Sequence, residues 1–276
     1  MQPVSLTAQW TAAIRAIESE RPQDALFQDS LARHLAQPDG FSLLDRRRGG
    51  GVKEFVIIRT RYFDDASLAA VDGSAGIRQL VLIAAGMDAR AYRLNWPQNT
   101  RIFELDHAPL LEEKARRLDA IQASPKAARV PVPVDLVLDW SQALLDAGFD
   151  RTQPTLWLVE GLLFFLTQEQ VQTVLGTCRR LSAAHSRMVV DMISASLLRS
   201  PLSQSFLASL RRDHMPWQFG TDEPEAFLAS LGWTVLDLKE PGMAGAGGSR
   251  WPYPLKPRNI PGIARSWLLT AELARK

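Results

Sequence analysis

The chain has 276 residues, of which 46% are hydrophobic and 22% are charged, and its formal net charge is +2. This length and apolar fraction suffice for one large domain with a buried core. The near-neutral charge provides no strong field for nucleic acid or a membrane surface. No apolar stretch reaches the roughly 20 residues of a transmembrane helix, since the longest, TLWLVEGLLFFL, is shorter and contains Glu160. The composition therefore predicts a protein that binds neither nucleic acid nor membrane.

The chain contains one cysteine, Cys178, so no intrachain disulfide can form. A single cysteine fits a reducing compartment, and the N-terminus lacks the basic start and apolar run of a signal peptide. We therefore predict a cytoplasmic protein. Cys178 lies in an apolar helical pattern and is expected to be buried rather than nucleophilic. The sequence predicts no metal site and is compatible with a homodimer.

Residues 1–75 are expected to be helical. Apolar side chains recur at helical spacing over residues 5–20, 24–37 and 52–71. The PDG tripeptide that follows residue 37 is expected to end the second helix. The basic run DRRRGGG, residues 45–51, is expected to be a flexible connector.

From residue 78 onward, short β-rich apolar runs alternate with helical segments. The runs lie within residues 79–85, 100–106, 128–136, 155–161 and 186–194. Such alternation is typical of an α/β fold whose parallel sheet is covered by helices on both faces. Residues 195–231 are expected to be mostly helical again. Two late runs, residues 233–240 and 264–273, predict final strands joined by a long loop rich in Gly and Pro.

Small or acidic residues follow four successive expected strands. Ala84, Ala85 and Gly86 follow the first strand and lead to Asp88. Small side chains let the backbone approach a ligand closely, and ligands of open parallel sheets bind at the carboxyl ends of the strands. The acids at the next three strand ends are Glu104, Asp106, Asp135 and Glu160. We therefore predict a binding cleft at this edge of the sheet.

The individual acids suggest individual roles. A carboxylate at the end of the second strand can accept both hydroxyl protons of a ribose, a role that we assign to Asp106 with Glu104 as the alternative. Because residues two apart lie on the same side of a strand, both acids can line the site. Asp135 can accept from an adenine amino group. Glu160, which precedes Gly161, is expected to face the cleft, because burying an unpaired carboxylate costs several kcal/mol.

The turn after the first strand distinguishes between nucleotide cofactors. Its sequence AAGMDA has one glycine, whereas a dinucleotide pyrophosphate needs a G-x-G-x-x-G turn, and no P-loop motif occurs in the chain. S-adenosylmethionine has no phosphate, its sulfonium and ammonium suit acids, and its carboxylate needs a cation such as Arg59 or Arg61. An NAD(P)-dependent oxidoreductase and a non-catalytic binding protein are the alternatives from other classes.

Several motifs together resemble the leucine carboxyl methyltransferase family, and most closely its bacterial branch of S-adenosylmethionine-dependent O-methyltransferases, which includes polyketide carboxylate methyl-ester synthases. The similarity extends from residue 6 to about residue 170. The motifs are LVLIAAGMDARAYRL (80–94), FELDHAPLLEEKARRL (103–118), VPVDL (132–136) and WLVEGLLFFLTQEQV (157–171). The resemblance implies the class I methyltransferase Rossmann-like fold, a seven-stranded, mostly parallel sheet whose last strand is antiparallel. It divides one domain into a helical cap (1–75), a cofactor-binding core (78–194), a helical lid insertion (195–231) and final strands (232–276).

The resemblance also implies how S-adenosylmethionine is held. Arg59 would bind the methionine carboxylate, and Glu160 would lie near the ammonium. Asp106 would bind the ribose, and Asp135 and Leu136 would contact the adenine.

The turn and its neighbours complete the predicted cofactor site with Ala84, Gly86, Asp88 and Gly161. The family usually has Gly-Ala-Gly where this chain has Ala84-Ala85-Gly86. An alanine suits the first position if its φ is negative.

The expected reaction is methylation of a small-molecule carboxylate to a methyl ester. A carboxylate is already ionised near pH 7, so the protein needs to orient it rather than to deprotonate it. The candidate orienting residues are Arg61, Tyr62, Arg199 and His214. A phenol would require a base, for which His107 or His214 is available, and a protein C-terminal carboxylate is a third acceptor class. Residues 213–220, with Trp217 and Phe219, can line an aromatic substrate pocket.

Overall fold

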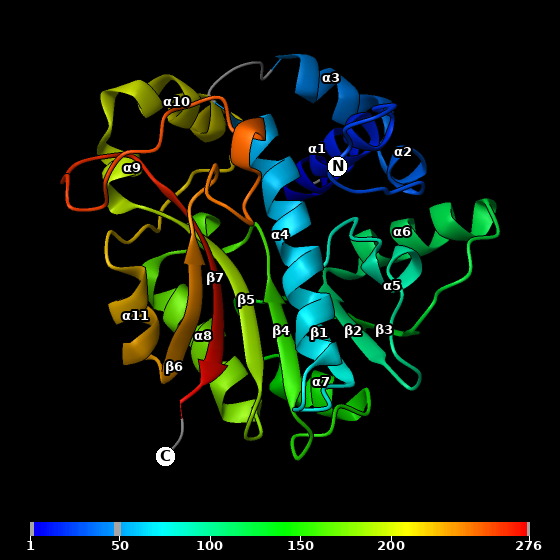
Figure 1. Ribbon diagram of the computed structural model, residues 1–276. Coiled ribbons are helices and arrows are strands. Elements are labelled where there is room, and N and C mark those ends of the chain that lie inside the picture. The colour runs from blue at the N-terminus through cyan, green and yellow to red at the C-terminus, as the bar shows by residue number, and fades with distance from the viewer. Residues whose placement is uncertain (1–2, 47–50, 275–276) are drawn as a thin grey trace.

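The computed structural model describes residues 3–46 and 51–274 and is built around a seven-stranded sheet in the order β3-β2-β1-β4-β5-β7-β6 (Figure 1). Strands β1 to β5 pair in parallel, and β7 is antiparallel to both β5 and β6. The predicted fold class is therefore confirmed. The strands are β1 (Gln79–Ile83), β2 (Arg101–Asp106), β3 (Ala128–Pro133), β4 (Thr155–Val159), β5 (Arg187–Ile193), β6 (Trp233–Lys239) and β7 (Ser266–Leu273).

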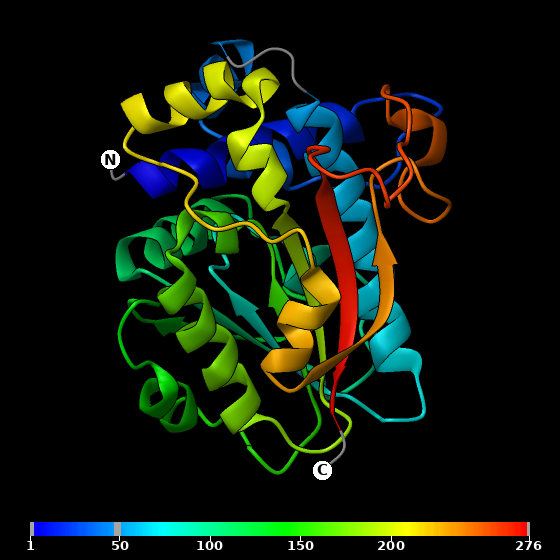
Figure 2. The same cartoon turned by 90° about the vertical axis from the view of Figure 1, so that its left-hand side faces the viewer.

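Two apolar clusters cover the two faces of this sheet. Leu80 and Leu82 of β1 pack in the cluster that contains α4 (Val52–Asp72), whereas Val81 and Ile83 pack in the cluster that contains α8 (Gln168–Leu181). Figures 1 and 2 show these two helices on opposite sides of the strands. Because both faces are covered, β1 and β4 are apolar and buried throughout rather than alternating. The remaining core helices are α5 (Arg90–Arg93), α6 (Ala108–Ala120), α7 (Ser141–Asp146) and α11 (Pro224–Ser230).

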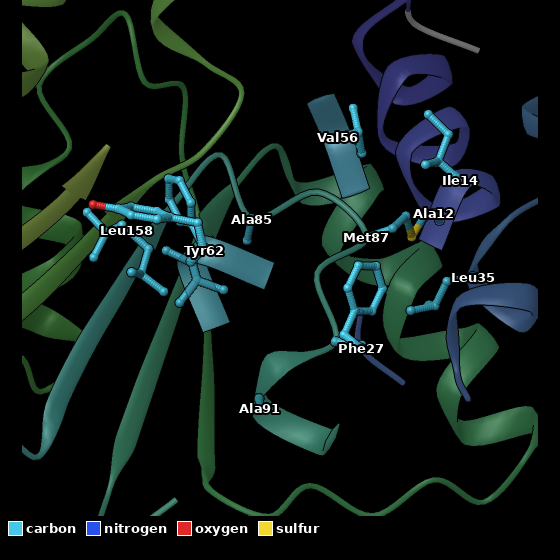
Figure 3. Packing of buried hydrophobic residues seen from close by; sticks show 14 of the residues in the cluster. Ala12, Ile14, Phe27, Leu35, Val56, Tyr62, Ala85, Met87, Ala91 and Leu158 are labelled. Carbon is cyan, nitrogen blue, oxygen red and sulfur yellow. The ribbon is translucent and has the colours of Figure 1, made fainter. Parts of the chain in front are cut away.

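Two further groups of helices lie above the carboxyl ends of the parallel strands (Figures 1 and 2). They are α1 (Pro3–Ser19), α2 (Ala32–Leu35) and α3 (Pro38–Arg46) from the N-terminal part, and α9 (Ala195–Arg199) and α10 (Gln204–Arg212) from the expected lid. The Thr7 hydroxyl lies 3.6 Å from the Met215 sulfur and so connects α1 to the segment that follows α10. Figure 3 shows Ile14, Phe27 and Leu35 around Met87 of the turn after β1. The N-terminal helices therefore share an apolar cluster with the sheet.

The N-terminal segment differs from the prediction in its details. The helix expected over residues 24–37 is reduced to the single turn α2, because the Leu26 and Asp29 backbone N–H groups donate to side chains of α1. Residues 38–40 begin α3 rather than ending a helix, since proline is well suited to the first helical position. Helix α4, expected in the cap, packs along the sheet (Figure 1).

Most of the expected connector at 45–51 lies outside the described residues. Within the described ranges, no helix combines the length and the apolar character that a bilayer crossing requires.

Candidate functional site

A cavity of about 430 Å³ lies at the carboxyl ends of β1, β2 and β4, beneath residues of α1 and α10. Nine of the ten predicted cofactor residues line it: Arg59, Ala84, Gly86, Asp88, Asp106, Asp135, Leu136, Glu160 and Gly161. His107 and His214 also line it. The strand ends and α4 therefore bring together residues that are up to about a hundred positions apart in the chain, from Arg59 to Gly161.

The turn after β1 is tight and is fixed to the end of β2. The Ala85 N–H donates to the Leu105 carbonyl at 3.0 Å, and the Gly86 N–H donates to Asp106 Oδ2 at 2.8 Å. Ala84 has a φ of 60° and Gly86 a φ of 49°. The condition of a negative φ at Ala84 is therefore not met, and this alanine occupies the left-handed region at a cost of about 1–2 kcal/mol.

Asp106 is buried at the centre of this arrangement. The His107 N–H donates to its Oδ1 at 2.8 Å, while Oδ2 accepts from Gly86. Burial raises the pKa of Asp106, and the two backbone donors oppose that rise. Each carboxylate oxygen can accept a further hydrogen bond, so Asp106 is able to receive two hydroxyl groups. Asp135 is exposed at the rim, and its Oδ1 accepts from the Val137 N–H at 3.1 Å.

Two arginines flank Glu160 in the same cavity. Arg59 Nε lies 3.0 Å from Glu160 Oε1, and Arg59 Nη1 lies 3.0 Å from Asp191 Oδ2. Arg90 Nη1 lies 2.6 Å from Glu160 Oε2 and also pairs with Asp88. Burial disfavours the Glu160 carboxylate, but Arg90 and Arg59 lower its pKa. Burial likewise disfavours the Asp88 carboxylate, but the neighbouring cations, Arg90 above all, lower its pKa to about 2.

This cluster continues into the N-terminal helices. Arg90 and Arg93 both pair with Asp64, Arg93 also lies 3.7 Å from Asp29, and Arg15 lies 2.9 Å from Asp29. Arg15 Nη2 also donates to the Met87 carbonyl. The network comprises four arginines (15, 59, 90 and 93) and five carboxylates (29, 64, 88, 160 and 191). With all nine groups ionised it carries one excess negative charge, which suits a cationic ligand. Burial raises the pKa of Asp191, and Arg59 and the Gly161 N–H oppose that rise.

Gly161 allows Arg59 to approach the backbone. Its φ is 70°, and a Cβ at this position would lie 3.0 Å from Arg59 Nη1. The Gly161 N–H donates to Asp191 Oδ1 at 2.7 Å. The glycine that follows Glu160 is therefore required both by its backbone conformation and by the guanidinium beside it.

Glu104, the predicted alternative to Asp106, does not line the cavity. It is fully buried, with Oε2 2.9 Å from Lys114 Nζ on α6 and 2.7 Å from Arg129 Nε on β3. Glu104 and Asp106 lie on the same side of β2, but α6 packs over this side at Glu104 and leaves only the end of the strand, at Asp106, open to the cavity. Glu104 is therefore a core ion-pair residue and not a cofactor ligand.

Three predicted substrate-orienting residues also lie away from the cavity. Arg61, on the exposed face of α4, pairs with Asp65 at 2.7 Å. The Tyr62 hydroxyl lies 3.1 Å from Asp237 and is held against the last two strands. Arg199 pairs with Asp222. Successive helical residues are about 100° apart, so only Arg59 of the IIRTRYF segment faces the cavity, and the structure does not support a substrate role for Arg61, Tyr62 or Arg199.

Several cavity residues were not found from the sequence. Arg90 and Arg15 line the cavity, and Asp191 holds Arg59 beneath it. Asp191 had a recognisable signal, because it interrupts the apolar strand RMVVDMI in the same way as Glu160 ends TLWLV. Arg15 gave none, since it lies in an amphipathic helix whose partners only the tertiary structure reveals.

Aromatic side chains line the cavity next to Glu160 and Gly161. The ring centroid of Trp217 lies 4.4 Å from that of Phe164, 5.2 Å from Phe206 and 6.4 Å from Phe165. All four side chains line the cavity, whereas Phe219 packs against Phe227 in the core. The expected aromatic pocket is therefore present with Trp217 but without Phe219.

The model of the leucine carboxyl methyltransferase family matches residues 8–179, more than half of the chain. The chain belongs to this family. A protein of Streptomyces coelicolor is 41% identical over 255 residues, covering 84% of this chain and 82% of its own length. A protein of Mycolicibacterium smegmatis is 36% identical over 272 residues, covering 90% and 88%. Both relatives are named as proposed S-adenosyl-L-methionine-dependent methyltransferases.

Solved structures agree on the fold. A proposed methyltransferase from Thermobifida fusca superposes with a TM-score of 0.62 at 19% identity, covering 97% of this chain and 94% of its own. A duf574 family protein from Streptomyces avermitilis gives 0.61 at 14% identity, covering 95% and 96%. The predicted family and fold are confirmed, and so, at the level of the family, is S-adenosylmethionine as the cofactor.

Proposed function

We propose that this protein is an S-adenosylmethionine-dependent O-methyltransferase that converts the carboxylate of a small organic acid to a methyl ester. One observation carries the choice of acceptor. The cavity acids Asp88 and Glu160 are paired with arginines that lower their pKa values, so neither is a useful general base. A carboxylate acceptor needs no base, because it is already ionised near pH 7. An acceptor hydroxyl would need one, for which the candidates are His107 and His214, the two histidines that line the cavity.

The residues present fit the cofactor. Asp106, with free acceptor capacity on both oxygens, would bind the ribose hydroxyls. Asp135 and Leu136 would contact the adenine at the rim. Arg59 would bind the methionine carboxylate, and Glu160, at the negative end of the same ion pair, would lie near the ammonium. When bound, S-adenosylmethionine supplies a methyl group on a positively charged sulfur.

The protein would contribute position and environment. The excess negative charge of the buried network favours a cationic ligand over its neutral product. The apolar walls exclude water from the reacting atoms. Alignment of two bound reactants can supply about 7–11 kcal/mol of the barrier, so a reaction that uses no general base can still be catalysed effectively.

Calorimetric titration tests the cofactor. We expect S-adenosylmethionine to bind and NAD to give no heat. Asp106→Asn should weaken binding about 10- to 100-fold, because hydrogen bonds to a charged group contribute about 1.5–3 kcal/mol. Asp146→Asn, which alters an exposed acid of α7 outside the cavity, is the matched control and should bind normally. Binding of NAD in place of S-adenosylmethionine would refute the proposal.

Product chemistry tests the acceptor. Incubation with S-adenosylmethionine carrying a deuterated methyl group and a panel of carboxylic acids and phenols should yield esters that release labelled methanol in alkali. Alkali-stable methyl ethers would instead indicate hydroxyl methylation, with His214 as the candidate base because it lines the cavity.

A further inference from the structure

Trp217 has a buried hydrogen-bond donor without an acceptor. Its Nε1 is inaccessible to solvent and has no hydrogen-bond partner among the described residues. The indole lines the cavity, and the three rings around it, those of Phe164, Phe165 and Phe206, have no polar atoms to offer it. Buried N–H groups in native proteins almost always have a partner, so we expect the indole to meet an acceptor when a ligand enters the cavity and the surrounding side chains move aside to admit it.

Trp217 is held on the segment that follows Gly161. The Gln218 N–H donates to the Phe164 carbonyl at 2.6 Å, and the Gln218 side chain donates to the Phe165 carbonyl at 2.7 Å. These bonds fix the segment on the 3-10 helix η1 (Leu163–Phe165), which begins two residues after Gly161. The indole and the predicted methionine site are therefore joined through one short, rigid piece of chain.

The cavity offers few other ways to hold an anionic acceptor. The basic side chains that line it, apart from the two histidines, are Arg15, Arg59, Arg90 and Arg93. All four are already paired with buried carboxylates. Arg59, the one nearest Gly161, is assigned to the methionine carboxylate in the proposed function. Among the four aromatic side chains, the indole carries the one hydrogen-bond donor, so an acceptor held among these rings would find its donor there.

We propose that Trp217 is the acceptor-binding residue. Its indole N–H donates to one carboxylate oxygen of an aromatic acid whose ring packs against Phe164, Phe165 and Phe206. The other oxygen forms the new O–CH₃ bond, the C–S bond breaks with its electron pair remaining on sulfur, and no proton moves. This inference rests on the proposed function and narrows its acceptor from small carboxylic acids to aromatic ones.

Indole N–H resonances provide a direct test. The chain has eight tryptophans, so the ¹⁵N-labelled protein should give eight indole peaks, and Trp217→Phe should remove one and assign it. With the full chain saturated by S-adenosylhomocysteine, benzoate, 2-naphthoate or 4-biphenylcarboxylate should shift the Trp217 peak downfield in a saturable manner. If none of the three binds, or if one binds without moving this peak, the inference is overturned.

Variants separate the hydrogen bond from ring packing. Trp217→Phe should weaken the binding of the acid that shifts the peak by about ten-fold or more, with much less effect on its methyl ester and none on S-adenosylhomocysteine. Phe206→Leu, which trims an apolar wall, should weaken acid and ester equally. If Trp217→Phe weakened the binding of acid and ester equally, the indole would contribute only packing, and its role as hydrogen-bond donor would be refuted. Failure of S-adenosylhomocysteine to bind the unmodified protein would overturn the proposed function instead.

Discussion

Removing the Glu104 side chain should destabilise the protein without weakening cofactor binding. Glu104 and Lys114 are both fully buried, with Oε2 2.9 Å from Nζ, and Arg129 lies 2.7 Å from the same oxygen. Glu104→Ala leaves the Lys114 ammonium in the core without its carboxylate. Breaking a buried pair in this way costs about 3–5 kcal/mol. At roughly 2 °C per kcal/mol for a chain of this size, the melting temperature should fall by about 6–10 °C.

Urea unfolding and calorimetric titration, performed on the same preparations, measure both parts of this prediction. The double variant Glu104→Met/Lys114→Met should recover part of the lost free energy of unfolding, because a buried pair can often be replaced by apolar residues of similar volume, although Arg129 also loses its carboxylate partner. Arg129 keeps a contact with Tyr92 in that variant. All variants should bind S-adenosylmethionine with the affinity of the unmodified protein. Loss of affinity in Glu104→Ala with unchanged stability would refute the assignment of Glu104 to the core.

Three further predictions follow from the site and the core. Asp88→Asn should lower the free energy of unfolding by roughly 2 kcal/mol above pH 5. Burial opposes ionisation of Asp88, but Arg90 outweighs it and lowers the pKa of Asp88 to about 2. That contribution exists above the ordinary aspartate pKa and is lost as the pH falls, so urea unfolding should show the difference narrowing below about pH 4. Gly161→Ala should weaken S-adenosylmethionine binding about ten-fold, as measured by calorimetry, because a Cβ at this left-handed position would clash with Arg59. Gly176 lies on α8 with open space around it, so the control Gly176→Ala should bind normally and gain about 0.5–1 kcal/mol of stability. Burial raises the pKa of the Cys178 thiol, so iodoacetamide at pH 8 should label the unfolded chain and not the folded one, as mass spectrometry would show.

The strand-end acids were predictable because a parallel sheet converts sequence order into position. Asp106, Asp135 and Glu160 each follow an apolar run, and the carboxyl ends of parallel strands meet at one edge. The same argument gave a wrong role for Glu104, because the alternation of side chains shows which side of the strand a residue lies on but not which helix packs over that side. Lys114 lies ten residues further along, on α6, and only the packing of that helix decides that Glu104 meets an ammonium rather than a ligand.

Backbone conformation and helix phase set a second limit. Nothing in the letters AAG shows that the first alanine must adopt a φ of 60°, because the bond from Ala85 to Leu105 that fixes this turn belongs to the neighbouring strand. In IIRTRYF, the three candidates Arg59, Arg61 and Tyr62 lie within four residues. Side chains this close together on a helix point in different directions, so they cannot all face one cavity. Arg59 faces the acids, whereas Tyr62 reaches Asp237, 175 positions away.

The proposed acceptor site is less predictable than the proposed cofactor site, and the family match shows why. That match ends at residue 179, before α9 and α10 begin. The segment beyond it supplies Phe206 and Trp217, while Phe164 and Phe165 come from the matched part. The hydrogen bond from Gln218 to Phe164 joins the matched part to the segment beyond it. These residues are more than fifty positions apart, so no local pattern encodes the contact. Membership of the family can therefore carry over the cofactor chemistry, but the choice of acceptor has to be argued from the side chains that this chain places around Trp217.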